Sequence, residues 1–236
     1  MFNSNKLLVG NQFGFRKVIA TEDAIFKLTN EILNALNNKT LAGSIFCDLE
    51  KAFNSVNRDV LLSKLPYYGV RGKAELLLES YLQNRYQVVQ INSYLNSNTV
   101  SEWTKIRYGV PQDSILGPLL FLVYINNLPK AIEHKAIPIL FADSTSILIT
   151  SPNNIQLQSD LNIVFGQLNK LFKANVLSFN FDKTYFTKFT NRSTCTSDIL
   201  ITYEDKCICT VIETKFLGLF INNGAWGSIV VKALRY

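Results

Sequence analysis

Hydrophobic side chains recur at spacings of three and four in two long segments, a period typical of helices with one buried face. The first segment covers residues 24–36 and follows Thr21, a candidate N-terminal cap. The second covers residues 157–172. Residues 115–125 are almost continuously apolar, which predicts a helix buried on all sides. Two shorter segments also have helical character: residues 60–65 and 74–82.

Runs of β-branched and aromatic residues between these segments predict strands. One apolar strand, two hairpins and three short strands follow in chain order: residues 41–47, 85–91 with 99–106, 136–142 with 145–150, 185–189, 199–203 and 215–221. The first hairpin has a tip rich in Asn and Ser, and Asp143 and Ser144 form the tip of the second. Because helices alternate with hairpins, the pattern predicts an α+β fold with helices on one face of an antiparallel sheet.

Composition limits the functions open to the chain. Its 236 residues are 47% hydrophobic, which is enough to bury a large core. Lys and Arg outnumber Asp and Glu by 24 to 18, and the resulting pI near 9.1 suits a polyanionic partner without establishing one. The single histidine, His134, lies among charged residues, so most chemistries that need a histidine base are excluded.

No secretion or membrane signal is visible in the sequence. The apolar run at residues 115–125 is shorter than the about 20 residues that span a bilayer. The cysteines form no C-x-x-C pair and have no nearby histidine to complete a zinc site: Cys47, Cys195, Cys207 and Cys209. We therefore expect reduced thiols in an intracellular protein of the nucleus or cytoplasm that is neither secreted nor bound to a membrane.

Two aspartates follow buried segments in a similar way. Asp48 ends the run 45–47, and Asp143 lies between two apolar strands. In an antiparallel sheet these two ends can meet, and carboxylates held there are suitable ligands for the Mg²⁺ ions of phosphoryl transfer. An aspartate at a hairpin tip is also commonly structural, because it bonds its own backbone. Spacing alone leaves both interpretations open.

Six segments in one order give the chain a more specific character, and two of them contain the aspartates. They are Asn11-Gln12-Phe13-Gly14-Phe15-Arg16, Phe46-Cys47-Asp48-Leu49-Glu50-Lys51-Ala52-Phe53, Tyr108-Gly109-Val110-Pro111-Gln112 with Ser114-Ile115-Leu116-Gly117-Pro118, Phe141-Ala142-Asp143, residues 177–183, and Lys215-Phe216-Leu217-Gly218. Together they resemble the reverse transcriptase domain of non-LTR retrotransposons of the jockey-like kind. Six ordered motifs do not arise by chance.

The resemblance implies a fold and a reaction. It implies the palm of a right-hand polymerase with partial fingers and no thumb, built from an antiparallel sheet backed by helices. This domain would cover residues 1–222, and residues 223–236 would be an unrelated tail. The implied reaction is RNA-directed DNA synthesis, in which two Mg²⁺ ions assist nucleotidyl transfer onto a primer 3′-OH. Its partners would be an RNA template, a DNA primer and deoxynucleoside triphosphates.

The resemblance also assigns catalytic roles to individual residues. Asp48 and Asp143 would bind both metal ions. Lys183 would lie near the pyrophosphate, as a charge stabiliser or a proton donor.

Three further residues would bind the substrates. Phe53 would be the wall that rejects a ribonucleotide 2′-hydroxyl. Gln112 would contact the incoming nucleotide or the template. Arg16 would meet phosphates or the template, although a surface role fits it equally well.

Several motif positions depart from the family pattern. Ser144 stands where the family has a second aspartate, so one metal-binding carboxylate is missing. Asp113 replaces a glycine, which adds bulk and a negative charge near phosphates. Asn54 replaces an aspartate that usually follows the aromatic wall. The first two changes oppose catalysis.

Three hypotheses follow for the function. The chain is a working polymerase, or a truncated and mutated transposon copy whose activity is weak or lost, or a non-catalytic RNA-binding module derived from a reverse transcriptase. The altered motif positions favour the second hypothesis. Only the net charge of +6 supports the third.

Overall fold

The computed structural model describes residues 7–91, 99–132, 134–190, 199–203, 206–223 and 229–233. The chain divides into two compact units, which are described separately. The first comprises residues 1–52 and 125–236, and the second comprises residues 53–124. Within the described ranges, no helix is both long and apolar enough to cross a membrane.

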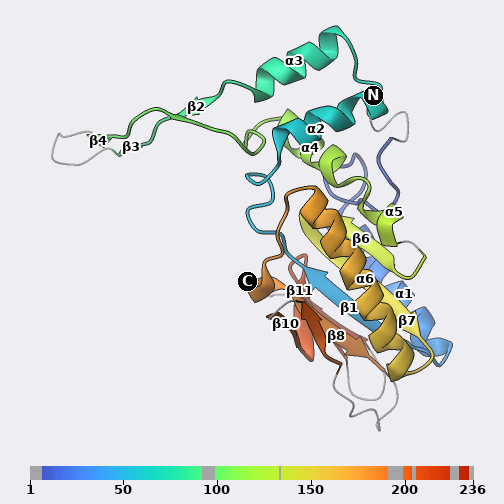
Figure 1. Ribbon diagram of the computed structural model, residues 1–236. Coiled ribbons are helices and arrows are strands. Elements are labelled where there is room, and N and C mark those ends of the chain that lie inside the picture. Colours follow the sequence, from blue (N-terminus) through green and yellow to red (C-terminus); the bar gives the residue numbers. More distant parts are fainter. Residues whose placement is uncertain are drawn as a thin grey trace. The chain divides into compact units, whose positions relative to one another are not determined.

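A six-stranded sheet forms the centre of the first unit (Figure 1). Its order is β6 (Ile137–Phe141), β7 (Ser144–Ser151), β1 (Leu41–Cys47), β8 (Tyr185–Phe189), β10 (Lys206–Thr210) and β9 (Ile201–Tyr203). All neighbours are antiparallel except β8 and β10, which are parallel. The mixed α+β fold with a largely antiparallel sheet is confirmed.

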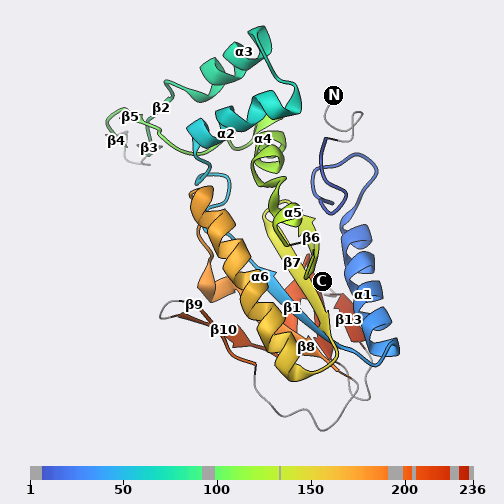
Figure 2. The ribbon, with the colours of Figure 1, turned by 45° about the vertical axis from the view of Figure 1, so that its right-hand side comes forward.

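Helices cover both faces of this sheet rather than one (Figure 2). Side chains alternate between faces along β1. Ala42 and Phe46 lie in one buried cluster with the apolar face of α1 (Thr21–Asn37). A Cβ at Gly43, on the other face, would lie 3.3 Å from Leu157 of α6 (Asn154–Ala174). The prediction of helices on one face is therefore wrong, because both faces of a central strand this apolar require cover.

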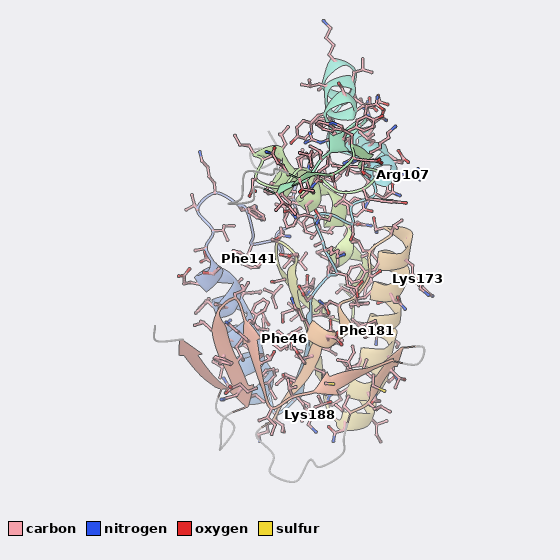
Figure 3. All side chains as sticks on the ribbon, turned by 90° about the vertical axis from the view of Figure 1, so that its left-hand side faces the viewer. Phe46, Arg107, Phe141, Lys173, Phe181 and Lys188 are labelled. Carbon is pink, nitrogen blue, oxygen red and sulfur yellow. The ribbon has the colours of Figure 1, made fainter. Side chains whose placement is uncertain are left out.

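A three-stranded sheet packs into the α1 side of the core. It consists of β11 (Glu213–Phe216), β12 (Leu219–Asn223) and β13 (Ile229–Ala233). The single strand predicted at 215–221 is instead a hairpin, because Leu217 and Gly218 both have positive φ and turn the chain. Phe216 reaches the core, where its ring centroid lies 5.6 Å from that of Phe46, labelled in Figure 3.

The sequence pattern did not predict β10 or β13. Strand β13 pairs along all of β12, so residues 229–233 belong to the small sheet. The domain boundary after residue 222 stays a prediction.

Helix α1 begins at Thr21, one residue earlier than a Thr21 cap would place it. Ala20 occupies the cap position, and the backbone N–H of Ala20 donates a hydrogen bond to the Asp23 carboxylate at 2.8 Å. An acid in the first turn therefore satisfies this backbone donor.

The second unit contains helices and a long two-stranded ribbon. Its elements are α2 (Arg58–Lys64), a 3₁₀ helix η1 (Leu65–Tyr68), α3 (Lys73–Leu82), β2 (Tyr86–Gln87) paired with β5 (Thr104–Lys105), β3 (Gln90–Ile91) paired with β4 (Thr99–Val100), and α4 (Leu116–Ile125), whose last residue lies outside the unit. The predicted hairpin is confirmed at its base, and its tip lies outside the described residues. Helix α4 is buried from Leu120 onward, but Ile115 before it is 96% exposed, so burial on all sides is wrong for its start.

Arg58 holds the chain between β5 and α4 in place. Its guanidinium is buried and donates to three backbone carbonyls, those of Ile106 (2.8 Å), Gly109 (2.9 Å) and Tyr108 (3.2 Å). The Asn57 side chain caps the helix that carries Arg58 by accepting from two backbone N–H groups. A single buried cation therefore satisfies three carbonyls that have no partner in a strand or helix.

Replacing Arg58 should destabilise the second unit. Arg58→Met keeps the aliphatic stem but removes all three donors, so we expect a loss of about 3 kcal/mol or more in free energy of unfolding, measured by urea denaturation. Arg71→Met, at an exposed arginine, is the matched control and should change stability by less than about 0.5 kcal/mol. Equal losses in the two variants would contradict the role given to Arg58.

Candidate active site

Asp48 and Asp143 lie at the same end of the central sheet. Asp48 follows the last residue of β1, and Asp143 lies in the two-residue turn between β6 and β7. Cys47 pairs with Thr145 of β7, which brings the end of β1 beside this turn. Burial raises the pKa of Asp143, and the negative charge of Asp48 raises it further. The expected meeting of these two strand ends is therefore present.

The turn that carries Asp143 is held by Gln12, a contact that the sequence analysis missed. Gln12 is buried, and its Oε1 accepts from the backbone N–H of Gly14 (2.8 Å) and of Ala142 (3.1 Å). A Cβ at Gly14 would lie 2.3 Å from the Ala142 nitrogen, so only glycine fits there. In the same segment, the Phe13 N–H donates a hydrogen bond to the Leu140 carbonyl at 2.7 Å. The segment 11–14 thus fixes the turn at the edge of β6.

Lys183 lies beside Asp48 because the segments that carry them pair. Leu49 bridges to Phe179, and the Asn180 N–H donates to the Asp48 carbonyl at 3.0 Å. Lys183 Nζ is then 3.8 Å from Asp48 Oδ2, and Asn180 Nδ2 is 3.4 Å from the same oxygen. Lys183 is 70% exposed, so this ion pair contributes little stability and can exchange for another partner.

A hollow of about 420 Å³, the aspartate hollow, opens next to Asp48. Among its charged lining groups are Asp48, Lys183 and Lys215, and Ser144 also faces it. The remaining lining residues are Phe46, Cys47, Thr145, Tyr185, Thr214, Phe216 and Leu217. Two cations therefore accompany one anion, and a hydroxyl is present where a second carboxylate would add negative charge.

Two of the predicted substrate-binding residues, Phe53 and Gln112, belong to the second unit. Gln112 is exposed, and its Nε2 donates to Asn54 Oδ1 at 3.1 Å. Phe53 packs against Phe121, with ring centroids 4.6 Å apart. A Cβ at Gly109 would lie 2.9 Å from Asn54 Cα, so the two segments approach as closely as a glycine allows. The structure thus brings Phe53, Asn54 and Gln112 together.

Arg16 uses part of its guanidinium within the fold. Its Nη1 donates to the carbonyls of Val9 (3.2 Å) and Gln12 (3.1 Å). A contact of Arg16 with phosphate or template stays a prediction.

Comparison with known proteins shows the family of this chain. Residues 2–221 match the family described as reverse transcriptase (RNA-dependent DNA polymerase). The chain belongs to the reverse transcriptase family. A probable RNA-directed DNA polymerase from transposon BS of Drosophila melanogaster is 30% identical over 234 residues, covering 94% of the chain and 24% of that relative.

The polymerase from the mobile element jockey of the same species is 28% identical, covering 77% of the chain and 20% of the relative. The chain thus spans about a quarter or less of the length of these reverse transcriptase relatives. These matches confirm the resemblance to non-LTR, jockey-like retrotransposon enzymes.

Solved structures of telomerase from Candida tropicalis share the fold. One, truncated from its C-terminal domain, superposes with a TM-score of 0.59 at 15% identity and covers 93% of the chain and 41% of its own. Another, of the apo enzyme, has a TM-score of 0.59 at 11% identity and covers 97% and 38%. At this identity the likeness shows the fold alone, and it is consistent with a partial palm and fingers.

The structure shows the position and conformation of two residues that depart from the reverse transcriptase pattern, Ser144 and Asp113. Ser144 is the first residue of β7, not part of the turn, and it faces the aspartate hollow. Asp113 has a φ of 52°, a left-handed conformation that costs a non-glycine residue about 1 kcal/mol. Glycine at this position would remove both the strain and the charge.

The carboxylates suit a divalent cation only in part. Within the described residues, no group of three or more His, Cys, Asp or Glu side chains could hold a metal. Asp48 and Asp143 remain as a pair, and Mg²⁺ is commonly held by one or two carboxylates together with substrate phosphates. The donor set thus fits Mg²⁺ that arrives with a phosphorylated substrate better than a preformed metal centre.

Removing the Gln12 amide should loosen the turn beside Asp143. Gln12→Ala leaves two buried backbone N–H groups without their acceptor, so we expect a loss of about 2 to 4 kcal/mol in free energy of unfolding by chemical denaturation. Gln167→Ala, at an exposed glutamine of α6, should cost less than about 0.5 kcal/mol. A stability close to that of the parent would rule out Gln12 as the residue that holds this turn.

Neutralising Asp143 should stabilise the protein in a pH-dependent way. The folded state raises the pKa of Asp143, so ionisation at neutral pH opposes folding. Asp143→Asn should therefore raise the Tm at pH 7, and the gain should disappear near pH 3, where the carboxyl is protonated in both states. Thermal unfolding followed by circular dichroism tests this, with the exposed Asp182→Asn as the control. A gain that is independent of pH would refute the electrostatic explanation.

Proposed function

We propose that this chain carries the nucleotidyl-transfer site of an RNA-directed DNA polymerase and that Ser144 and Asp113 impair that activity. The observation that carries the proposal is the placement of Asp48 and Asp143 at one end of the sheet, with Lys183 Nζ 3.8 Å from Asp48. An acid pair beside a cation suits a reaction in which negative charge develops on phosphate oxygens. The substrates would be an RNA template, a DNA primer and deoxynucleoside triphosphates.

Each side chain would have a distinct role in this reaction. Asp48 and Asp143 would hold Mg²⁺ through their carboxylate oxygens, together with oxygens of the triphosphate. When bound, Mg²⁺ supplies charge neutralisation for the attacking and leaving oxygens. Lys183 is free enough to leave Asp48 and stabilise the departing pyrophosphate, because its side chain is 70% exposed. It could also donate the proton that this group takes up.

Phe53 and Gln112 would select and hold the nucleotide. The Phe53 ring is fixed against Phe121, which suits a rigid wall that excludes a 2′-hydroxyl. Gln112 is oriented by its bond to Asn54, so its exposed amide is available to a nucleotide or template base.

Ser144 weakens the site through electrostatics. A second carboxylate at the start of β7 would face the aspartate hollow and offset the charges of Lys183 and Lys215. The hydroxyl of Ser144 carries no charge, so a divalent cation meets less compensating negative charge there. A loss of about 1.4 kcal/mol in transition-state stabilisation lowers the rate tenfold.

Restoring the two motif residues should raise polymerase activity. We expect Mg²⁺-dependent extension of a DNA primer on an RNA template to be at least about a hundredfold faster in the Ser144→Asp, Asp113→Gly double variant than in the parent. Isothermal titration should also show tighter Mn²⁺ binding in the double variant, which reports on the site independently of turnover.

The control adds Asp48→Asn to the double variant and should abolish both gains. If the double variant folds but neither extends a primer nor gains metal affinity, the proposal is wrong. RNA binding that both changes leave untouched, with no extension, would favour the non-catalytic RNA-binding module.

A further inference from the structure

The second unit contains a hollow of about 490 Å³ that shares no lining residue with the aspartate hollow. We call it the ribbon hollow, because the base of the β2–β5 ribbon forms one wall. It is lined by the start of α2, the end of α3 and the chain that follows β5: Asn57, Arg58, Asp59, Gln83, Asn84, Lys105, Ile106, Arg107 and Tyr108. No role in the proposed catalytic chemistry accounts for it.

Positive charge predominates among the lining side chains. Lys105, Arg107 and Arg58 are cationic, and Asp59 is the one acidic lining residue. Arg58 is 7% exposed and is tied to three carbonyls, so it contributes a fixed charge behind the wall. Lys105 and Arg107 are exposed, as Figure 3 shows for Arg107, and neither forms a salt bridge within the described part of the chain. Two cations are therefore available to a ligand.

Neutral donors and aromatic rings surround these cations. Gln83 and Asn84 contribute exposed amides to the hollow, and Tyr108 is 52% exposed on its wall. Tyr86, which is 56% exposed, pairs with Lys105 across the ribbon, so the two side chains lie next to each other on one face. Cations interleaved with amides and exposed aromatic rings are typical of surfaces that bind nucleic acid.

We propose that the ribbon hollow binds the phosphodiester backbone of a nucleic acid, with Lys105 and Arg107 as its phosphate contacts. The proposal takes its ligand class from the proposed function and adds a second anchoring point in the unit that also carries Phe53 and Gln112. Lys105 and Arg107 bind by charge, so they contribute affinity without reading sequence. Tyr86 and Tyr108 supply ring faces against which a sugar or base can pack.

Charge removal at the two phosphate contacts tests the proposal. At low ionic strength, the Lys105→Gln, Arg107→Gln double variant of the full chain should bind a fluorescent nucleic acid at least about tenfold more weakly than the parent. The slope of log affinity against log salt concentration should fall by about two, one for each lost contact. Fluorescence anisotropy measures both quantities, with a single-stranded RNA and an RNA–DNA hybrid of equal length as probes.

A matched control removes the same net charge elsewhere. Lys130 and Lys170 are exposed on α5 (Leu128–Ile132) and α6, and Lys130→Gln, Lys170→Gln should leave affinity and salt slope close to those of the parent. A loss confined to one probe supports the proposal and identifies the form of nucleic acid that supplies the phosphates. An unchanged salt slope, or an equal loss in the control, would overturn it.

Binding is measured without Mg²⁺ or nucleotides, so the result does not depend on catalysis. A Ser144→Asp, Asp113→Gly variant that folds but neither extends a primer nor gains metal affinity would refute the proposed function, and a loss of nucleic-acid affinity on Lys105 and Arg107 substitution would still keep the ribbon hollow as a binding site. Primer extension by the Ser144→Asp, Asp113→Gly variant, together with a nucleic-acid affinity that Lys105 and Arg107 substitution leaves unaltered, would support the proposed function and overturn the ribbon hollow as a binding site. Circular dichroism melting of both double variants confirms that the comparison is between folded proteins.

Discussion

The backbone pairing of β1 on both of its edges is the constraint on which the first unit depends. Antiparallel ladders join it to β7 along seven residue pairs and to β8 along five. Every residue of the strand is buried, with one face toward α1 and the other toward α6. The chain direction at the end of β1 is therefore determined by two neighbours at once. Asp48 follows the last residue of β1, so the paired strand fixes its position more firmly than a loop would.

The same rigidity creates an electrostatic conflict. The pairing of β1 with β7 holds Asp48 near Asp143, and the raised pKa of Asp143 reflects both its burial and that neighbour. Lys183 offsets part of this charge, but it is exposed and its contact with Asp48 is 3.8 Å, which is long for an ion pair. The ionised form of Asp143 is therefore disfavoured in the folded protein, and the loosely held lysine removes only part of that penalty.

Buried polar side chains carry out the local positioning in both units. Gln12 fixes the turn beside Asp143, and Arg58 fixes the segment 106–109 that precedes Gln112. Neither residue was assigned a positioning role from the sequence. A polar residue in a sequence pattern gives no sign that its side chain is buried, because its partners can lie far away in the chain. Gln12 binds Ala142, which is 130 positions away, and Arg58 binds Gly109, which is 51 positions away. Only the folded backbone shows which carbonyl and N–H groups lack a partner in regular structure and need a side chain instead.

The sequence by itself determined the elements with strong periodicity and the family. The helices at α1 and α6, the strand β1 and the β6–β7 hairpin follow from side-chain spacing, because local hydrophobic period is set by helix and strand geometry. Ordered motifs then identified the family and the residues that depart from its pattern.

Tertiary structure decided what spacing cannot encode. Helices lie on both faces of the sheet, residues 213–223 form a hairpin rather than one strand, and Lys183 meets Asp48 through a bridge between Leu49 and Phe179. These outcomes depend on contacts between segments far apart in the chain. Their free energy comes from burial and pairing that exist only after the segments have met.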